Sequence, residues 1–331
     1  MRVGITFDLR QAYLDQGYGL EETAEFDKLE TIDGIANALL ELGHEPDRIG
    51  HASELMQALV EGQRWDLVFN IAEGLRGFGR EALVPCLLDA FDIPYTFSDP
   101  LVLALCLHKG MCKRIIRDLG IPTADFRVIE CSQDVERVDL PFPLFAKPVA
   151  EGTGKGVSPA SRVAGHEELR RVCLQLLVDY RQPVLLETYL PGREFTVGVL
   201  GTGPAARAIG VMEVRFRDQA RDVYSYQSKE HYLDAVRYEF LTEQALCEKV
   251  EQVALAAWRG LGCRDAGRVD IRADARGLPC FMEANPLAGL NSVHSDLPIL
   301  GRLAGWSFVE LIGFIVDSAV SRVTDARCRA A

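Results

Sequence analysis

Apolar and polar positions alternate along the first hundred residues in the manner of an α/β protein. Residues 3–7 form an apolar run typical of a buried strand, and residues 31–42 place apolar side chains at helical spacing before Gly43. A second strand is predicted at residues 66–71. These βα units predict an N-terminal α/β domain over residues 1–100.

The remaining chain divides into a central and a C-terminal unit. Residues 101–119 predict a helical stretch and residues 143–148 a short strand, which we assign to a central unit over residues 101–182. The C-terminal unit, residues 183–331, contains the clearest helix, since an apolar stripe repeats at helical spacing up to Gly262. Its expected strands are residues 184–189, 195–200, 209–216, 267–273 and 280–284, and its closing helices fall within residues 306–323.

Composition and charge narrow the class of protein. Apolar residues make up 48% and charged residues 25% of the 331 residues, as in soluble multidomain proteins. The longest apolar run, residues 101–107, is far shorter than the roughly 18 residues of a membrane-spanning helix, and the first residues lack the features of a secretory signal. A net charge of -12 disfavours a broad nucleic-acid surface. We therefore expect a cytoplasmic protein that binds neither membrane nor nucleic acid.

The nine cysteines are an odd number and form no Cys-x-x-Cys pair. Most of them lie in apolar runs. We interpret them as reduced core residues, in preference to a zinc site or disulfides.

Two predicted strands near the C-terminus carry polar side chains at alternate positions. Arg268 and Asp270 share one face of the first strand, because side chains two residues apart point the same way. Glu283 and Asn285 share a face of the second strand for the same reason. Carboxylate and amide oxygens are the donors that Mg²⁺ prefers, and Arg268 beside them suits a charged phosphoryl group. A structural ion pair between Arg268 and an acid explains the pattern equally well on these residues alone.

A glycine-rich segment follows Lys147. Three glycines within residues 152–156 let backbone N–H groups approach a polyphosphate, while Thr153 adds a hydroxyl donor and the lysines add positive charge. The segment is not a Walker A loop, because Gly156 follows Lys155 where that motif has serine or threonine. A plain glycine-rich hairpin turn is the alternative interpretation.

Taken in this order and spacing, the motifs resemble the D-alanine-D-alanine ligase branch of the ATP-grasp superfamily along nearly the whole chain. The stretches that carry the resemblance are residues 92–98, the region of Lys109, and residues 147–158, 187–197, 262–270 and 283–285. The resemblance implies an α/β ATP-grasp fold preceded by a Rossmann-like domain. It also implies an ATP-dependent carboxylate-amine ligase that forms an amide or peptide bond, a homodimer, and two Mg²⁺ ions that Mn²⁺ can replace.

The resemblance assigns roles to individual residues. Those that match nucleotide-binding positions of the family are Lys109, Lys147, Glu151, Gly152, Gly154, Glu187, Tyr189, Leu190 and Glu194. Those that match magnesium ligands are Asp270, Glu283 and Asn285, and those that match catalytic positions are Arg268, Lys229 and Thr153.

Three lysines, Lys109, Lys147 and Lys229, match residues of the family that contact the ATP phosphates. Glu187 and the backbone near Tyr189 match the hinge that reads adenine, with Leu190 packing nearby, and Glu194 matches the acceptor for the ribose hydroxyls. Arg268 matches the arginine that steadies the acyl phosphate and the tetrahedral intermediate.

The amino-acid pocket departs from the family pattern. Glu230 follows Lys229 where the family has tyrosine, and Thr153-Gly154 stands in place of a pair of serines. His294 lies near the position of a serine that would bind the carboxylate of the second substrate, although a histidine at a helix start is more often structural. The candidate substrate contacts are Glu25, Asp27, Glu230, Gly289, Asn291 and His294. We therefore expect retained ATP chemistry with changed amino-acid substrates.

The implied mechanism has two displacements. A substrate carboxylate attacks the γ-phosphorus of ATP, and an amine then attacks the resulting acyl phosphate. Since an acyl phosphate hydrolyses in water, a lid is expected, and the candidates are residues 8–26, 152–156 and 224–232. Two alternatives stay open: an intramolecular, cyclising ligase of specialised metabolism and a non-catalytic nucleotide-binding regulatory protein. The expected partners are small-molecule carboxylates and amines, whose identity and stereochemistry the sequence does not give.

Overall fold

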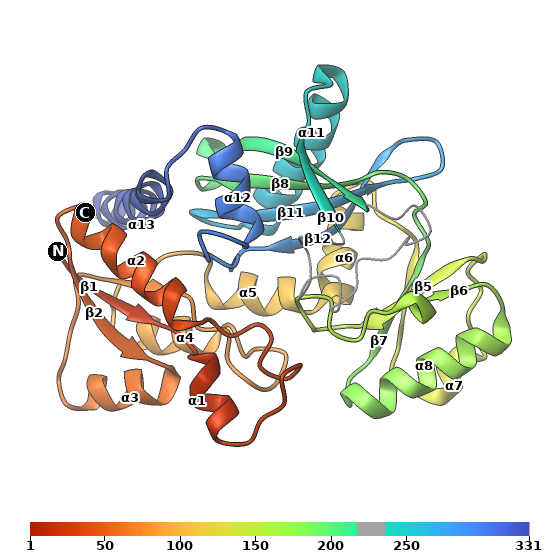
Figure 1. The fold of residues 1–331 in the computed structure, drawn as a ribbon, viewed down its shortest axis with the longest axis horizontal. Helices are drawn as coiled ribbons and strands as arrows, with labels where there is room; N and C mark the ends of the chain where they lie inside the picture. The colour runs from red at the N-terminus through yellow and green to blue at the C-terminus, as the bar shows by residue number, and fades with distance from the viewer. Residues whose placement is uncertain (217–235, 331) are drawn as a thin grey trace.

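The computed structural model describes residues 1–216 and 236–330 of the chain. Its strands form three separate sheets of three, four and five strands. In Figure 1 the N-terminal sheet lies at the left, the four-stranded sheet at the right, and the five-stranded sheet above and between them. This mixed helix and strand arrangement is the α/β class expected from the sequence.

The N-terminal sheet is parallel and resembles half of a Rossmann fold. Its strands are β1 (Arg2–Thr6), β2 (Glu45–Gly50) and β3 (Leu67–Asn70), in the order β2-β1-β3. Its helices are α1 (Arg10–Asp15), α2 (Leu29–Glu41), α3 (Ala52–Val60) and α4 (Leu83–Ala90). Val3 and Ile5 are fully buried on β1. The sequence analysis did not find β2, because an edge strand with mostly polar, partly exposed residues has no apolar run.

The four-stranded sheet is antiparallel and carries the segment that precedes the glycine-rich loop. Its strands are β4 (Phe126–Ile129), β5 (Leu144–Pro148), β6 (Arg162–Val163) and β7 (Val184–Thr188), in the order β4-β7-β5-β6. The helices here are α7 (Ser132–Val135) and α8 (His166–Tyr180), with a short 3-10 helix at Pro159–Ser161. β7 pairs with β4 and β5 and therefore belongs to this sheet. The sequence pattern had grouped it with the strands of the C-terminal unit, which is wrong.

The five-stranded sheet forms the C-terminal part. Its strands are β8 (Glu194–Leu200), β9 (Arg207–Phe216), β10 (Val236–Phe240), β11 (Ala266–Ala273) and β12 (Pro279–Asn285), in the order β10-β9-β8-β11-β12. A 3-10 helix at Gly203–Ala205 joins β8 to β9. Helix α11 (Gln244–Leu261) packs on one face with Val250, Ala254 and Trp258 fully buried, and Gly262 ends it in the left-handed conformation. Ile299 and Leu300 pack against part of the other face, beside Met212 on β9.

The helical stretch expected over residues 101–119 is two helices, α5 (Pro100–Leu107) and α6 (Lys109–Asp118). The break falls at His108, whose backbone leaves the helical region and whose Nδ1 accepts a hydrogen bond from the amide of Met111. The break coincides with the end of the apolar run of residues 101–107, where His108, Lys109 and Gly110 follow. One consequence is that Lys109 begins a helix, with its amide bonded to the carbonyl of Val149 just before the glycine-rich loop.

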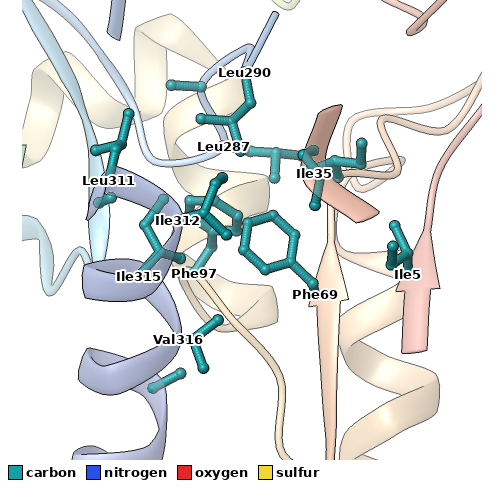
Figure 2. Packing of buried hydrophobic residues seen from close by; sticks show 14 of the residues in the cluster. Ile5, Ile35, Phe69, Phe97, Leu287, Leu290, Leu311, Ile312, Ile315 and Val316 are labelled. Atoms are coloured by element: carbon teal, nitrogen blue, oxygen red, sulfur yellow. The ribbon is translucent and has the colours of Figure 1, made fainter. Parts of the chain in front are cut away.

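The C-terminal helix completes the N-terminal core. Helix α12 (Asp296–Leu303) leads to α13 (Phe308–Ala330), and Trp306 lies between them, outside the helix predicted over residues 306–323. The α13 residues Leu311, Ile312, Ile315 and Val316 belong to one buried cluster with Ile5, Ile35, Phe69 and Phe97 from the first hundred residues (Figure 2). One hydrophobic core therefore combines residues of the N-terminal unit with residues of the C-terminal unit.

Two further sequence predictions can be compared with the described residues. The eight cysteines that they include with their side chains are all free thiols, and five of these are buried, as expected for reduced core residues. Within residues 1–216 and 236–330 no single helix is long and apolar enough to span a membrane. Helix α12 and residues 308–324 reach that length and apolar composition only when they are counted together, and the two helices are bent by 110° relative to each other.

Candidate active site

The polar face of the C-terminal sheet is built by strands β8, β11 and β12. Asp270 on β11 lies directly opposite Glu283 on β12, and Arg268 lies directly opposite Asn285. Val269 between them is fully buried against helix α11, so the alternation predicted from the sequence is correct. The four polar residues therefore project together from two adjacent strands.

Asp270 is bonded to residues of both neighbouring strands. Its carboxylate accepts hydrogen bonds from Thr196 Oγ1 at 2.9 Å and from Asn285 Nδ2 at 3.1 Å. Arg268 Nη1 lies 3.1 Å from Asp270 Oδ2 and 2.7 Å from Asp296 Oδ2 at the start of α12. Arg268 thus forms ion pairs with acids, which was the alternative interpretation of this pattern in the sequence. These pairs hold its guanidinium at the margin of a cavity.

Two lysines from different elements converge on Glu283. Lys109 Nζ and Lys147 Nζ both lie 3.7 Å from Glu283 Oε2. Lys147 on β5 also pairs at 3.3 Å with Glu187 on β7, which Lys113 approaches at 2.5 Å. Burial alone would lower the pKa of Lys147, but Glu187 and Glu283 outweigh it and raise this pKa above its usual value. The ammonium group of Lys147 is therefore held charged beside Glu187 and Glu283.

Glu194 and Tyr189 lie beside an arginine that the sequence analysis did not single out. Arg272 Nη1 lies 3.3 Å from Glu194 Oε2, and its Nη2 donates a hydrogen bond of 3.1 Å to the hydroxyl of Tyr189. Glu194 and Arg272 line a cavity of about 100 Å³ together with Lys109, Lys147 and the glycine-rich loop. Leu190 follows Tyr189 on the connection from β7 to β8 and is partly buried.

Several residues of the glycine-rich loop have backbone angles that residues with side chains rarely adopt. Gly154 and Gly156 have positive φ angles of 74° and 73°, and Thr153 has a φ of 50°, which is uncommon for a residue with a side chain. A Cβ atom at Gly152 would lie 2.2 Å from Glu25 Oε1. Thr153 Oγ1 is buried and makes no hydrogen bond to the described residues. The backbone of this loop therefore depends on its glycines, and the loop holds a buried hydroxyl without a hydrogen-bond partner among the described residues.

A buried ion network ties this loop to the N-terminal domain. Lys155 Nζ lies 2.6 Å from Glu25 Oε2 and 2.5 Å from Glu151 Oε2, and Arg80 Nη2 lies 3.1 Å from the same Glu25 oxygen. Arg80 Nη1 also donates to the carbonyl of Ala150 at 2.9 Å. Burial would raise the pKa of Glu25, but Arg80 and Lys155 outweigh it and lower this pKa. Glu25, a predicted substrate contact, is thus already neutralised by two cations of the protein.

The other predicted substrate residues line a larger neighbouring cavity of about 310 Å³. Asp27, Gly289, Asn291 and His294 lie in its wall beside Arg268. Asn291 Nδ2 donates a hydrogen bond of 3.1 Å to the hydroxyl of Thr31, next to Asp27. Burial raises the pKa of Asp27 to about 7. The structure thus brings together residues that are up to 267 positions apart in the chain, from Asp27 to His294. Lys229 and Glu230 lie outside the described residues.

The donor chemistry of Asp270, Glu283 and Asn285 fits a magnesium ion. Two carboxylates and an amide carbonyl are hard oxygen donors, and so small a set leaves positions for the oxygens of a bound phosphate. No group of three His, Cys, Asp or Glu side chains suited to a metal occurs in the part of the chain that the structure describes. A magnesium site here therefore depends on the amide of Asn285 as its third protein donor.

Sequence comparison connects this geometry with known proteins. The profile of the family described as "D-ala D-ala ligase C-terminus" matches residues 115–317. The D-alanine-D-alanine ligase of Bordetella petrii is 32% identical over 294 residues, which are 88% of this chain and 86% of that enzyme. The chain belongs to the D-alanine-D-alanine ligase family. The family member from Aquifex aeolicus is likewise 32% identical over 289 residues, which are 87% of this chain and 94% of that enzyme.

A solved structure of the family supports the fold. The D-alanine-D-alanine ligase from Bacillus anthracis, in a crystal structure with ATP, superimposes with a TM-score of 0.75 at 23% sequence identity, covering 98% of this chain and 99% of that chain. The ATP-grasp fold and the D-alanine-D-alanine ligase branch predicted from the sequence are therefore confirmed. Family membership also supports the coarser expectation of an ATP-dependent ligase of this type, while the substrates stay a prediction.

Several residues of this family member's site were missed by sequence reasoning. They are Arg80, Lys113, Thr196, Arg272 and Asp296. Thr196 and Arg272 had a detectable signal, because alternation along β8 and β11 places them on the same face as Glu194 and Asp270. The others reach the site through contacts between distant segments, which no local pattern indicates.

Proposed function

We propose that this protein is an ATP-dependent ligase that activates a small carboxylate as an acyl phosphate and joins it to an amine. One observation carries the proposal: Lys109 and Lys147 converge on Glu283, directly opposite Asp270, in one cavity beneath the glycine-rich loop. Cations, oxygen donors and a loop of backbone amides are the groups that phosphoryl transfer requires. A cytoplasmic homodimer that uses two Mg²⁺ ions, replaceable by Mn²⁺, is part of the same proposal.

Nucleotide binding would use residues along the interface of two sheets. Lys109, Lys147 and the amides of residues 152–154 would contact the phosphates, and Glu194 would accept hydrogen bonds from the ribose hydroxyls. Glu187 and the backbone at Tyr189 would lie at the adenine, with Leu190 packing beside it. The ATP complex of the related Bacillus anthracis enzyme supports a nucleotide in this fold.

Asp270, Glu283 and Asn285 would hold magnesium, which supplies charge neutralisation for the transferring phosphate. The protein's own groups position the reactants. A carboxylate oxygen of the donor attacks the γ-phosphorus and the bond to the bridging oxygen of ADP breaks. The amine nitrogen of the acceptor then attacks the acyl carbon, phosphate leaves, and the nitrogen loses a proton. Arg268 would stabilise the negative charge of the acyl phosphate and of the tetrahedral intermediate.

The substrates are proposed to differ from a pair of D-alanines. Glu25 is neutralised by Arg80 and Lys155 inside the protein. Arg268 pairs with Asp296 in addition to Asp270. Asp27 and His294 add titratable groups to a cavity of about 310 Å³. A substrate that leaves Asp27 or His294 without a polar partner would bind poorly. The cavity would therefore favour amino acids or amines that are larger and more polar than alanine.

Hydroxylamine trapping tests the proposal without knowledge of the acceptor. Purified protein with ATP, Mg²⁺ and hydroxylamine is offered single amino acids of both hands, and hydroxamate and ADP are measured. At least one carboxylate is expected to give hydroxamate and ADP in equal amounts. Absence of both across the panel would favour a non-catalytic nucleotide-binding protein. Mass spectrometry of products formed without hydroxylamine separates intermolecular joining from cyclisation.

A further inference from the structure

Asp296 contacts Arg268 from a different element of the fold than Asp270 does. Arg268 and Asp270 both belong to β11, whereas Asp296 is the first residue of α12. Arg268 Nη1 lies 2.7 Å from Asp296 Oδ2 and 3.1 Å from Asp270 Oδ2, so one guanidinium nitrogen lies between two acids. Asp296 lines both the cavity of about 310 Å³ and the neighbouring cavity of about 100 Å³. The proposed phosphoryl transfer gives this acid no role of its own.

Helix α12 is held in place by apolar packing. Leu297, Ile299 and Leu300 are buried. Leu297 belongs to the core shared with the N-terminal domain. Ile299 and Leu300 form a buried cluster with Met212 on β9. A Cβ atom at Gly198 would lie 2.8 Å from Leu300 Cδ2, so the helix also lies close against β8. The position of α12 therefore does not depend on its charged first residue.

The turn that leads into α12 is restrained by Asn291. Its Oδ1 accepts hydrogen bonds from the amides of Val293 at 3.0 Å and His294 at 3.3 Å. Its Nδ2 donates a hydrogen bond of 3.1 Å to the hydroxyl of Thr31 on α2, and its backbone amide donates one of 3.0 Å to Ser295 Oγ. The carboxylate that follows this turn is therefore presented from a backbone that is restrained on both sides.

An ion pair between α12 and β11 can serve two purposes. It can join the helix to the sheet, or it can hold the direction of the Arg268 guanidinium. Apolar packing already joins the helix to the sheet, so the pair is not needed for the first purpose. The arginine side chain has several rotatable bonds, and each restraint set before the reaction lowers the entropy lost in reaching the transition state. The second purpose therefore explains the pair better.

We propose that Asp296 is a positioning residue that holds the Arg268 guanidinium in the direction from which it meets the acyl phosphate. The inference rests on the proposed function for the task of Arg268, and it adds the acid on which that task depends. Asp270 is less suited to this purpose, because the proposed function also assigns it to magnesium. A carboxylate bound to a dication attracts a guanidinium less strongly. Loss of Asp296 should therefore lower kcat more than it changes substrate binding.

A double-mutant cycle in the hydroxylamine assay tests this dependence. Asp296→Ala is expected to lower kcat about 10- to 100-fold with KM for ATP nearly unchanged, and Asp296→Asn, which keeps the shape of the side chain, is expected to lower it less. In the Arg268→Met background, Asp296→Ala is expected to have no further effect on kcat, because the group that it positions is absent. If Arg268→Met does not fold, Arg268→Gln takes its place.

The control for this cycle is Glu310→Gln. Glu310 is an exposed acid in the first turn of α13 and lines neither of the two cavities. Its replacement should leave kcat at the wild-type value. Independent, additive effects of the Asp296 and Arg268 changes on kcat would overturn the inference, since they would assign Asp296 a structural role only. Thermal unfolding midpoints of all variants show whether each protein is folded.

A binding measurement separates this inference from the proposed function. ADP and Mg²⁺ are added with or without orthovanadate, a mimic of the transferring phosphoryl group, and thermal unfolding midpoints are recorded for wild type, Asp296→Asn and Glu310→Gln. Vanadate is expected to raise the midpoint less in Asp296→Asn than in the other two proteins, while ADP alone acts equally on all three. This result supports the inference even if wild type forms no hydroxamate, an outcome that contradicts the proposed function. An equal effect of vanadate on all three proteins, or no effect on any, overturns the inference.

Discussion

Asp270 on β11 and Glu283 on β12 lie directly opposite each other in antiparallel register. Their carboxylates differ in surroundings: Asp270 is bonded to Thr196, Asn285 and Arg268, whereas Glu283 lies 3.7 Å from two lysines. From this difference we infer different tasks for the two acids in the proposed metal site. Asp270 is held firmly by its neighbours, and Glu283 lies where the lysines would share it with a metal and a phosphate.

Replacing Glu283 tests that assignment. Glu283→Gln keeps the shape of the side chain and removes its charge, so ATP binding is expected to persist while hydroxamate formation falls about 100- to 1000-fold. Rates at saturating ATP and Mg²⁺ and the affinity for ATP are measured together. A thermal unfolding midpoint close to wild type serves as the control for folding. Near-normal turnover under these conditions would contradict the metal assignment.

The polar face could be predicted because it depends on local rules. Alternation along residues 268–270 and 283–285 places side chains on one face of a strand whatever its partners are. The Glu25–Lys155 pair could not be predicted, since it joins residues 130 positions apart and depends on how the loop lies against the N-terminal domain. The sheet to which β7 belongs and the packing of α13 against α2 are likewise decided by tertiary packing.

Glu194 is predicted to act on nucleotide affinity more than on rate. Glu194→Ala should raise KM for ATP by an amount equivalent to about 1.5 to 3 kcal/mol, because a charge-assisted hydrogen bond to ribose is lost. ATP and 2'-deoxy-ATP are compared in both proteins. Because Glu194 also pairs with Arg272 at 3.3 Å, Arg272→Met is the control for loss of that pair. An unchanged KM in Glu194→Ala places the ribose elsewhere.

Lys155 is predicted to stabilise the glycine-rich loop. Lys155→Met leaves Glu25 and Glu151 buried with one cation fewer, so the free energy of unfolding should fall by about 3 to 5 kcal/mol in urea denaturation. Lys28→Met, which removes an exposed lysine, should change it by less than about 0.5 kcal/mol. Equal stability of Lys155→Met and wild type would show that the buried network contributes little.

Asp27 predicts a dependence of stability on pH. Burial raises its pKa from 3.8 to about 7, so the folded protein binds this proton more tightly than the unfolded chain. The contribution of Asp27 to the free energy of unfolding therefore decreases as pH rises from about 4 to 7. Asp27→Asn should gain stability relative to wild type across that window, measured by denaturation from pH 4 to pH 8. The exposed control Asp15→Asn should show no such trend, and a constant difference for Asp27→Asn would contradict the prediction.

Isotope transfer tests the central claim most directly. The best donor amino acid from the panel is labelled with ¹⁸O in its carboxylate and incubated with ATP, Mg²⁺ and an amine acceptor, and the released phosphate is analysed by mass spectrometry. Activation as an acyl phosphate predicts ADP and one ¹⁸O atom in each phosphate, with a pair of D-alanines a poor substrate set. Unlabelled phosphate, AMP in place of ADP, or D-alanyl-D-alanine as the best product of the panel would contradict the account.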